Sequence, residues 1–271
     1  MFVFRGANAV LTGASRGIGP YLARRLAAEG VNLTLVARDR AALEKLASEL
    51  TGIETRVVAV DLSDPASIAV IEAEALGPVD LLVNNAGVET FSHFERFPPE
   101  EIQRAVAVNL TTPMLLTRAF LPGMLERKRG YIVNMSSLAG VIGSAYTEVY
   151  NATKHGLVGF TRGLRSSLAD SEVGATVLCP GFVSDVGMYV NMKAEAEKFA
   201  PKTVGTVTPQ AVAEAMIRAI QNDEPDVLIA GGPPLRPILA LQTLTPKLAE
   251  WIAKKLGTND VMAPVADSRH K

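Results

Sequence analysis

The sequence predicts a doubly wound α/β domain with a seven-stranded parallel sheet and helices on both faces. Short apolar runs alternate along the chain with longer windows whose apolar residues recur at helical spacing. A helix between two strands carries the chain back to the same end of the sheet, so these strands must run parallel. The runs are apolar at almost every position, which is typical of strands that are buried on both faces.

The seven expected strands are short runs rich in valine, leucine, isoleucine and alanine. They cover residues 9–11, 31–37, 55–60, 79–83, 131–135, 175–178 and 226–229. The clearest helical windows between them are residues 19–29, 40–50 and 150–168. No repeat, linker or change in composition interrupts this pattern before about residue 232. We therefore expect a single domain over residues 1–271, and its 48% hydrophobic content is enough for one sizeable core.

Charge and cysteine content argue against several classes of protein. The 27 Lys and Arg residues balance 28 Asp and Glu residues, and no basic stripe indicates a nucleic-acid partner. The one cysteine cannot form an internal disulfide, and with three scattered histidines it makes no metal-binding set. No secretory leader or membrane-spanning run is evident. We expect a cytoplasmic protein that holds no metal and binds no nucleic acid.

A glycine-rich loop follows the first expected strand and opens the first helix. Its candidate cofactor-binding residues are Gly13, Ser15, Arg16, Gly17, Ile18 and Gly19. Glycines permit a tight turn and let backbone amides approach a pyrophosphate, which the N-terminus of the helix also attracts. A structural turn without a ligand is the alternative. The position between a strand and a helix favours a dinucleotide site.

The end of the second expected strand indicates which dinucleotide binds. About 20 residues beyond the glycines, a dinucleotide-binding fold places the group that contacts the adenosine ribose. Ala37 stands there in place of a carboxylate, and the guanidinium of Arg38 suits a 2′-phosphate, which Arg16 can approach from the other side. A solvated loop cation is the alternative for Arg38, and Asp39 lies next to it. We expect NADP(H) in preference to NAD(H).

Tyr150 and Lys154 share one face of an expected helix, because residues four apart are neighbours. An isolated phenol titrates near pH ~10, and a nearby ammonium favours its ionised form. Ser137 follows the fifth expected strand, at the sheet edge where parallel sheets bind ligands. Its hydroxyl can donate to a carbonyl oxygen on which charge develops. A capping or turn serine is the alternative, and that role fits Ser136 or Ser144 better.

Several short motifs occur in the order and spacing of the short-chain dehydrogenase/reductase family. They are residues 12–19, Asn84-Asn85-Ala86-Gly87, Asn109, Ser137, Tyr150, Lys154 and Pro180-Gly181. This resemblance covers roughly residues 6–185 and implies a Rossmann sheet and a hydride transfer between nicotinamide and a carbonyl or alcohol carbon. It implies that Tyr150 is the general acid/base and that Ser137 orients the substrate carbonyl. Lys154 would bind the nicotinamide ribose, and Asn109 would hold a water that relays protons to it.

The resemblance also implies which other residues line the cofactor. The adenine would contact Asp61 and Leu62, the adenosine ribose Asn85, Ala86 and Gly87, and the nicotinamide Pro180, Gly181 and Val183. Asp185 stands where the family commonly has a threonine that bonds the carboxamide, and Ser184 can substitute for it. Structural alternatives are that Asn109 satisfies backbone groups at a helix irregularity, and that Asn84-Asn85 is a turn that pins two strands.

The region around the expected site indicates the substrate. By resemblance, residues 186–205 form a lid over the substrate pocket. The lid bears Met188, Tyr189 and Met192 at helical spacing, and the loop after Gly87 bears Phe91, Phe94 and Phe97. We expect an apolar or bulky carbonyl substrate, with ordinary core packing as the alternative for these side chains.

The last part of the sequence predicts a helical extension over residues 233–257. Its apolar stripe consists of Leu241, Leu244, Leu248, Trp251 and Ile252. The stripe fits a subunit contact or packing beside the cleft, and basic neighbours make a membrane surface the third possibility. We expect a homodimer or homotetramer and a disordered tail over residues 267–271.

Overall fold

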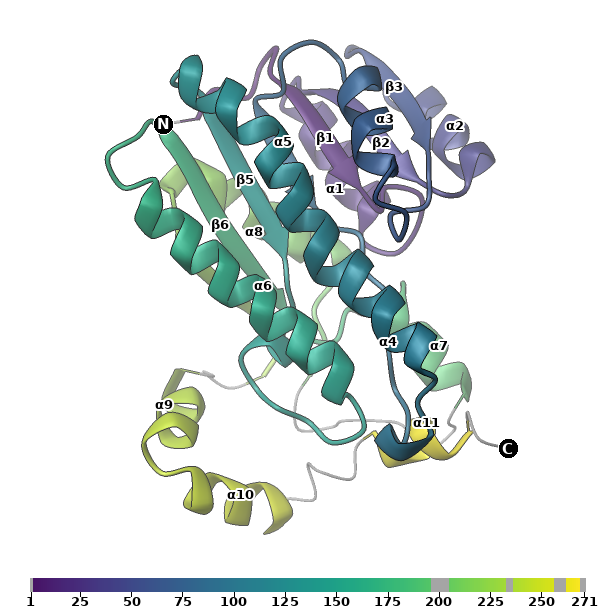
Figure 1. Ribbon diagram of the computed structural model, residues 1–271, viewed down its shortest axis with the longest axis vertical. Helices are drawn as coiled ribbons and strands as arrows, with labels where there is room; N and C mark the ends of the chain where they lie inside the picture. Colours follow the sequence, from purple (N-terminus) through teal and green to yellow (C-terminus); the bar gives the residue numbers. More distant parts are fainter. Residues whose placement is uncertain (1, 196–204, 233–235, 256–261, 269–271) are drawn as a thin grey trace.

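A computed structural model describes residues 2–195, 205–232, 236–255 and 262–268. Its centre is a seven-stranded parallel sheet in the order β3-β2-β1-β4-β5-β6-β7, which confirms the predicted fold class (Figure 1). Each strand lies within one or two residues of its predicted ends. The strands are β1 (Asn8–Thr12), β2 (Asn32–Ala37), β3 (Thr55–Ala59), β4 (Leu81–Asn84), β5 (Gly130–Met135), β6 (Val173–Pro180) and β7 (Asp226–Ile229).

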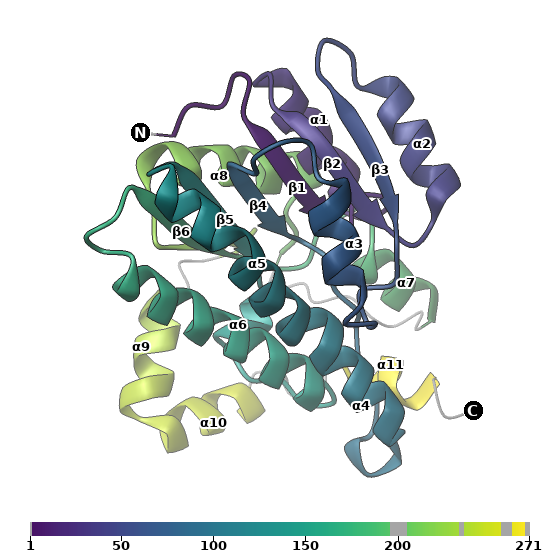
Figure 2. The ribbon, with the colours of Figure 1, turned by 45° about the horizontal axis from the view of Figure 1, so that its top comes forward.

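Helices cover both faces of the sheet (Figures 1 and 2). One face carries α1 (Gly19–Ala28), α2 (Arg40–Glu49) and α8 (Pro209–Asn222), and the other carries α3 (Ser67–Glu74), α5 (Thr112–Glu126) and α6 (Glu148–Ser167). Successive residues of a strand point to opposite faces of the sheet, so Leu11 belongs to the core under α1 while Val10 belongs to the core under α5. Each fully buried Leu or Val stabilises the fold by about 1.5–3 kcal/mol.

The strand order places a crevice at the centre of the sheet. The chain builds outward from β1 through β2 and β3, and then returns to add β4 on the other side of β1. The loops that follow β1 and β4 therefore diverge, and parallel sheets bind ligands at this point, beyond the carboxyl ends of the strands. The predicted glycine loop and the Asn84–Gly87 motif are these two loops.

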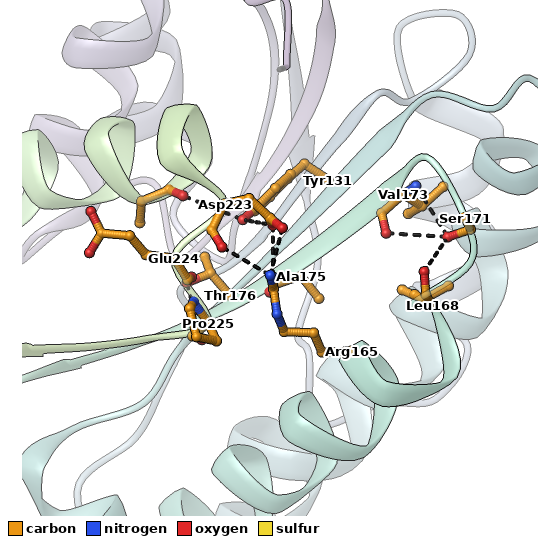
Figure 3. Close-up of polar contacts among 11 residues, drawn as sticks. Tyr131, Arg165, Leu168, Ser171, Val173, Ala175, Thr176, Asp223, Glu224 and Pro225 are labelled. Carbon is orange, nitrogen blue, oxygen red and sulfur yellow. Dashed lines mark hydrogen bonds and ion pairs between the residues drawn. The ribbon is translucent and has the colours of Figure 1, made fainter.

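A polar cluster joins the opposite ends of β5 and β6 to α6 and α8 (Figure 3). Arg165 of α6 donates to Asp223 Oδ1 at 2.7 Å and to the Ala175 carbonyl at 2.8 Å. The Tyr131 hydroxyl also donates to Asp223 Oδ1, at 2.9 Å. Asp223 follows α8 in the left-handed conformation, at φ 51°, which Asp and Asn tolerate better than most residues. The cluster lies away from the crevice, and its effect is on stability.

We expect Asp223→Asn to lower the free energy of unfolding by about 1 kcal/mol at neutral pH, because asparagine keeps the backbone conformation but loses the charge. The hydrogen bond from Arg165 lowers the pKa of Asp223. The loss is therefore full above the ordinary carboxyl pKa of about 3.9 and vanishes as the pH falls through the lower pKa of the folded protein. Urea unfolding across that range measures it. The exposed Asp170→Asn should change stability little at any pH, and an equal effect there would contradict the prediction.

The chain beyond β6 forms α7 (Met188–Glu195), which lies in the expected lid, and then α8 and β7. The described residues beyond β7 form α9 (Arg236–Leu244), α10 (Pro246–Lys255) and α11 (Ala263–Ser268). Residues 196–204, the rest of the expected lid, lie outside the described residues. The expected single apolar stripe is divided between α9 and α10 at Pro246, since proline lacks the amide that would continue a helix.

The α9–α10 pair leaves much of that stripe exposed. Leu244, Leu248 and Trp251 are 79%, 46% and 57% exposed, and the Ile252 side chain lies outside the described part. Nothing among the described helices is both long and apolar enough to cross a bilayer. The expectation of a disordered tail is not met at Asp267 and Ser268, which end α11, and residues 269–271 lie outside the described residues.

Candidate active site

The glycine-rich loop between β1 and α1 lies directly against the loop that follows β4. Gly13 and Gly17 adopt left-handed conformations, at φ 66° and 63°. A methyl group on Gly13 would stand 2.8 Å from the Ala86 Cα, and one on Gly19 would stand 2.1 Å from the Gly13 oxygen. At the start of α1 the Gly19 amide donates to the Arg16 carbonyl at 3.2 Å and the Tyr21 amide to the Ile18 carbonyl at 3.0 Å. The helix therefore favours an anionic ligand through the positive end of its dipole. These features fit the pyrophosphate of a dinucleotide.

Thr12 and Asn85 hold the two loops together. Thr12 Oγ1 accepts from the backbone amides of Asn85 and Ala86, each at 3.0 Å. Asn85 Nδ2 donates to the carbonyls of Thr12 and Gly13, at 3.0 and 3.2 Å. Asn84 Nδ2 donates to the Asn134 Oδ1 of β5 at 2.9 Å. This turn does pin strands, and the same bonds fix Ala86 and Gly87 beside the glycine loop.

Ser137 and Tyr150 meet at the carboxyl end of β5. Their hydroxyls lie close enough for Ser137 to act on the pKa of Tyr150. Ser137 Oγ also donates to the Pro180 carbonyl at 3.4 Å and accepts from the Ala139 amide at 3.1 Å, where it caps a 3-10 turn over Leu138–Gly140. The expectation that Ser136 suits a cap better was wrong, because Ser136 Oγ donates to the Lys154 carbonyl at 3.0 Å.

The environment of Tyr150 holds its hydroxyl in the protonated form. Burial raises the pKa of Tyr150 to about 12, and the Glu89 carboxylate acts in the same direction, whereas the hydrogen bond with Ser137 acts against them. The Lys154 ammonium was expected to lower this pKa, but it lies 5.6 Å from the ring centroid and burial dominates. At neutral pH the Tyr150 hydroxyl therefore keeps its proton.

Lys154 lies under the same site, only 3% exposed. Its Nζ donates to the Met135 carbonyl at 2.8 Å, and burial lowers the pKa of Lys154 to about 8. A methyl group on Gly87 would stand 3.5 Å from this Nζ, so the glycine keeps the space in front of the ammonium open. An ammonium has three donors, and those not used by Met135 suit hydroxyl acceptors such as a ribose diol.

Asn109 lies in a π-helical turn, Ala107–Thr111, that joins α4 (Pro99–Val106) to α5. Its side chain is fully buried; Oδ1 accepts from the Val88 amide at 2.8 Å, and Nδ2 donates to the Val88 carbonyl at 2.9 Å and to Thr153 Oγ1 at 3.2 Å. These bonds match the structural alternative for Asn109, a residue that satisfies backbone groups at a helix irregularity. Such π turns are frequent at functional sites. The relay water remains a prediction.

Residues 7–197 match the family model described as short chain dehydrogenase. The chain belongs to this family. Ketoacyl reductase HetN of Nostoc sp. is 35% identical over 280 residues, an alignment that covers 100% of this chain and 96% of the relative.

Two solved members of the family were crystallised with a nicotinamide cofactor. A metagenomic short-chain oxidoreductase in complex with NADP has 35% identity and a TM-score of 0.69, over 84% of this chain and 98% of that one. A Burkholderia phymatum short-chain dehydrogenase/reductase in complex with NAD has 29% identity and a TM-score of 0.79, over 92% and 96%. The chain is therefore an NAD(P)-binding oxidoreductase that acts on CH–OH groups.

The predicted adenosine side of this family site lies at the ends of β2 and β3. Arg38 is half exposed, and its Nη1 lies 3.9 Å from Asp61 Oδ2. Asp39 turns away to cap α2, since its Oδ1 accepts from the Ala42 amide at 3.0 Å. Arg16 is exposed on the glycine loop. The carboxylate of Asp39, the residue next to Arg38, is thus engaged in capping α2.

Asp61 and Leu62 follow β3, as their predicted role requires. The backbone amide and hydroxyl of Ser63 donate to Asp61 Oδ1, both at 2.9 Å, and together with Arg38 they lower the pKa of Asp61. Leu62 is buried, and its carbonyl accepts from Thr112 Oγ1 at 2.7 Å. The second carboxylate oxygen of Asp61 faces Arg38. The residue predicted to contact the adenine therefore lies next to the residue predicted to contact the 2′-phosphate.

The predicted nicotinamide side is the segment that follows β6. Val183 pairs with Val207, and Ser184 donates to the Val207 carbonyl through its amide at 2.9 Å and its hydroxyl at 3.4 Å. Asp185 takes a left-handed conformation, at φ 65°. A methyl group on Gly17 would lie 3.8 Å from the Gly187 Cα, so this segment crosses the glycine loop.

Sequence reasoning missed Glu89. Its carboxylate acts on the pKa of Tyr150 from the loop after β4. The signal was an acidic residue two positions after Gly87, in the loop that also bears Phe91, Phe94 and Phe97. Thr153 and Met135 were also missed, because their contacts with Asn109 and Lys154 depend on how α6 packs against the π turn and against β5.

Proposed function

We propose that this chain is an NADP(H)-dependent reductase of an apolar or bulky ketone or aldehyde. The observation that carries the proposal is the meeting of Ser137, a protonated Tyr150 and the Lys154 ammonium beside the crevice. A bound nicotinamide supplies the hydride that reduces the carbonyl carbon, or accepts it in the reverse reaction.

Each side chain has a separate task in this proposal. Ser137 donates to the carbonyl oxygen and holds it, and Tyr150 delivers the proton that completes the alcohol. Lys154 binds the nicotinamide ribose, and Asn109 holds the Val88 segment in place and positions a water that relays protons to Lys154. Reduction needs the phenol form of Tyr150, which its burial favours, whereas oxidation of the alcohol needs the phenolate.

The preference for NADP(H) rests on the cations at the ends of β1 and β2. Arg16 and Arg38 are exposed where a 2′-phosphate would lie, and the Asp39 carboxylate is held by α2. The alternative is an NAD(H)-dependent dehydrogenase of the same family, since Asp61 lies 3.9 Å from Arg38 and competes for its guanidinium.

An apolar substrate is supported by side chains that pack beside Tyr150. Phe91, Tyr189, Met192, Met262 and Val265 form a buried group, which we call the substrate-side cluster. The Phe91 ring centroid lies 6.0 Å from that of Tyr150. Phe94, in contrast, is exposed, so it does not contribute as expected.

We also propose that the chain forms one Rossmann-type domain and that it assembles as a homo-oligomer. The assembly is supported by an apolar hollow of about 370 Å³ between α5 and α6. Its apolar lining includes Met114, Leu121, Leu125, Phe160 and Leu164. Light scattering on the purified protein tests this assembly.

The test of function is NADPH oxidation with ketones, aldehydes, quinones and ketoacyl compounds of graded size, with NADH in parallel. Turnover of apolar carbonyls with NADPH supports the proposal. A preference for NADH favours the alternative dehydrogenase. Tight NADPH binding with no turnover of any carbonyl would point to a nucleotide-sensing protein, and redox-neutral conversion of the substrate would point to dehydration or epimerisation.

We expect Glu89→Gln to shift the pH profile of alcohol oxidation to lower pH by at least about 0.5 unit. Oxidation rises with pH as Tyr150 ionises, and loss of the Glu89 charge lowers the pKa of Tyr150. Initial rates of alcohol oxidation from pH 6 to 11 measure the shift. The exposed Glu126→Gln is the control, and a profile of Glu89→Gln that coincides with it would be the contrary result.

A further inference from the structure

The last described helix, α11, returns to the carboxyl ends of the strands and packs against α7 (Figure 1). Val265 and Ala266 are fully buried, and Met262 just before the helix is also buried. A helix of six residues is too short to be stable alone, so buried contacts determine its position. Helix α11 therefore lies on the substrate side of the sheet.

Two side chains from this end of the chain belong to the substrate-side cluster. Met262 and Val265 are buried there together with Phe91, the residue whose ring faces Tyr150. The cluster also contacts Met188, whose Cε would lie 3.9 Å from a methyl group on Gly87, in front of Lys154. Apolar contacts thus run from the reacting residues to α11.

A polar contact holds α11 to the same loop. Asp267 Oδ1 lies 2.9 Å from His93 Nε2, across 174 residues of sequence. The His93 ring packs edge-on against Tyr146, at a centroid distance of 5.1 Å, and Tyr146 borders the substrate-side cluster. The loop after β4 is therefore bound to α11 by Phe91 on its apolar side and by His93 on its polar side.

We propose that α11 forms the outer wall of the substrate pocket, and that Met262 and Val265 determine which carbonyl compounds fit. The inference rests on the proposed function and adds a substrate class to it, namely carbonyl compounds with an apolar group that extends away from Tyr150 toward α11. Asp267 is a positioning residue, because it acts through His93 on the placement of the helix.

Paired substitutions at Val265 test the wall. Val265 is fully buried, so Val265→Ala removes volume from the substrate-side cluster and lets Phe91 and Met262 move back from the pocket. We expect it to raise kcat/KM for a branched ketone relative to a linear one about tenfold. Val265→Ile adds volume to the same cluster and should move the ratio in the opposite direction. Loss of stability alone cannot produce opposite shifts. Leu244→Ala on α9 is the control, and ratios equal to wild type in both Val265 variants would overturn the proposal.

The positioning role of Asp267 is tested by whether its loss changes ketone binding alone. We expect Asp267→Ala to raise KM for the ketone about fivefold with kcat and the KM for NADPH unchanged, and Asp267→Glu to restore most of the loss. Equal effects on kcat and on both KM values would show a general structural role instead.

A benzophenone photoprobe gives a readout that does not need turnover. On irradiation its carbonyl oxygen takes a hydrogen from a neighbouring C–H group, and the two carbons then join. We expect peptide mapping to find the label at Met262 and Met262→Ala to lose it. Label at Met262 with no turnover of any ketone would reject the proposed function and keep the wall. Label confined to other segments would show that Met262 does not border the substrate pocket, and would overturn the proposal.

Discussion

Replacing Tyr150 with phenylalanine is expected to lower kcat at least 100-fold while NADPH binding stays nearly intact. The substitution removes only the hydroxyl, and the apolar ring still fills its buried position beside Phe91. General acid catalysis typically contributes about 10²–10⁴-fold. Steady-state NADPH oxidation and NADPH titration measure the two effects.

The control for this change is Tyr21→Phe, which removes the same atom from α1, outside the Ser137–Lys154 group. It should keep nearly full activity. Activity of Tyr150→Phe above about a hundredth of wild type would reject Tyr150 as the acid. A parallel loss of NADPH binding would instead show that the hydroxyl mainly supports the cofactor site.

The sheet was predictable because its strands are locally distinct. Runs such as residues 31–37 are apolar at five of seven positions, and helical windows separate them, so parallel pairing follows from chain connectivity. The end of the chain was less predictable. Pro246 divides the expected stripe into two helices, while α11 depends on contacts with α7, which no local pattern reveals.

The site shows the same division between local and long-range signals. Glycines at fixed spacing and the Tyr150–Lys154 pair are local patterns, and the structure brings both to the carboxyl ends of the strands. Most hydrogen-bond partners of Asn109 and Lys154 are different, since they are backbone groups of Val88 and Met135. Any residue type supplies a carbonyl, so side-chain identity carries no signal for such contacts.

Cofactor preference gives the second large expected effect. Arg38→Asp should lower the ratio of kcat/KM for NADPH to that for NADH at least about 100-fold. A charge-assisted hydrogen bond contributes about 1.5–3 kcal/mol, and the new carboxylate also repels a 2′-phosphate while it accepts from a free ribose diol. Kinetics with each cofactor at one saturating substrate concentration measure the ratio.

Because Arg38 also faces Asp61, the neutral Arg38→Leu separates the lost attraction from the added repulsion. It should lower the ratio by a smaller factor than Arg38→Asp. The matched control is Arg40→Asp, an equal change of charge two residues along the chain, where Arg40 faces Glu44 on the exposed side of α2. If Arg40→Asp shifted the ratio as much as Arg38→Asp, the effect would come from the general field of the surface. If neither Arg38 variant shifted it, the guanidinium would be a solvated loop cation, and the preference for NADP(H) would have no structural basis at β2.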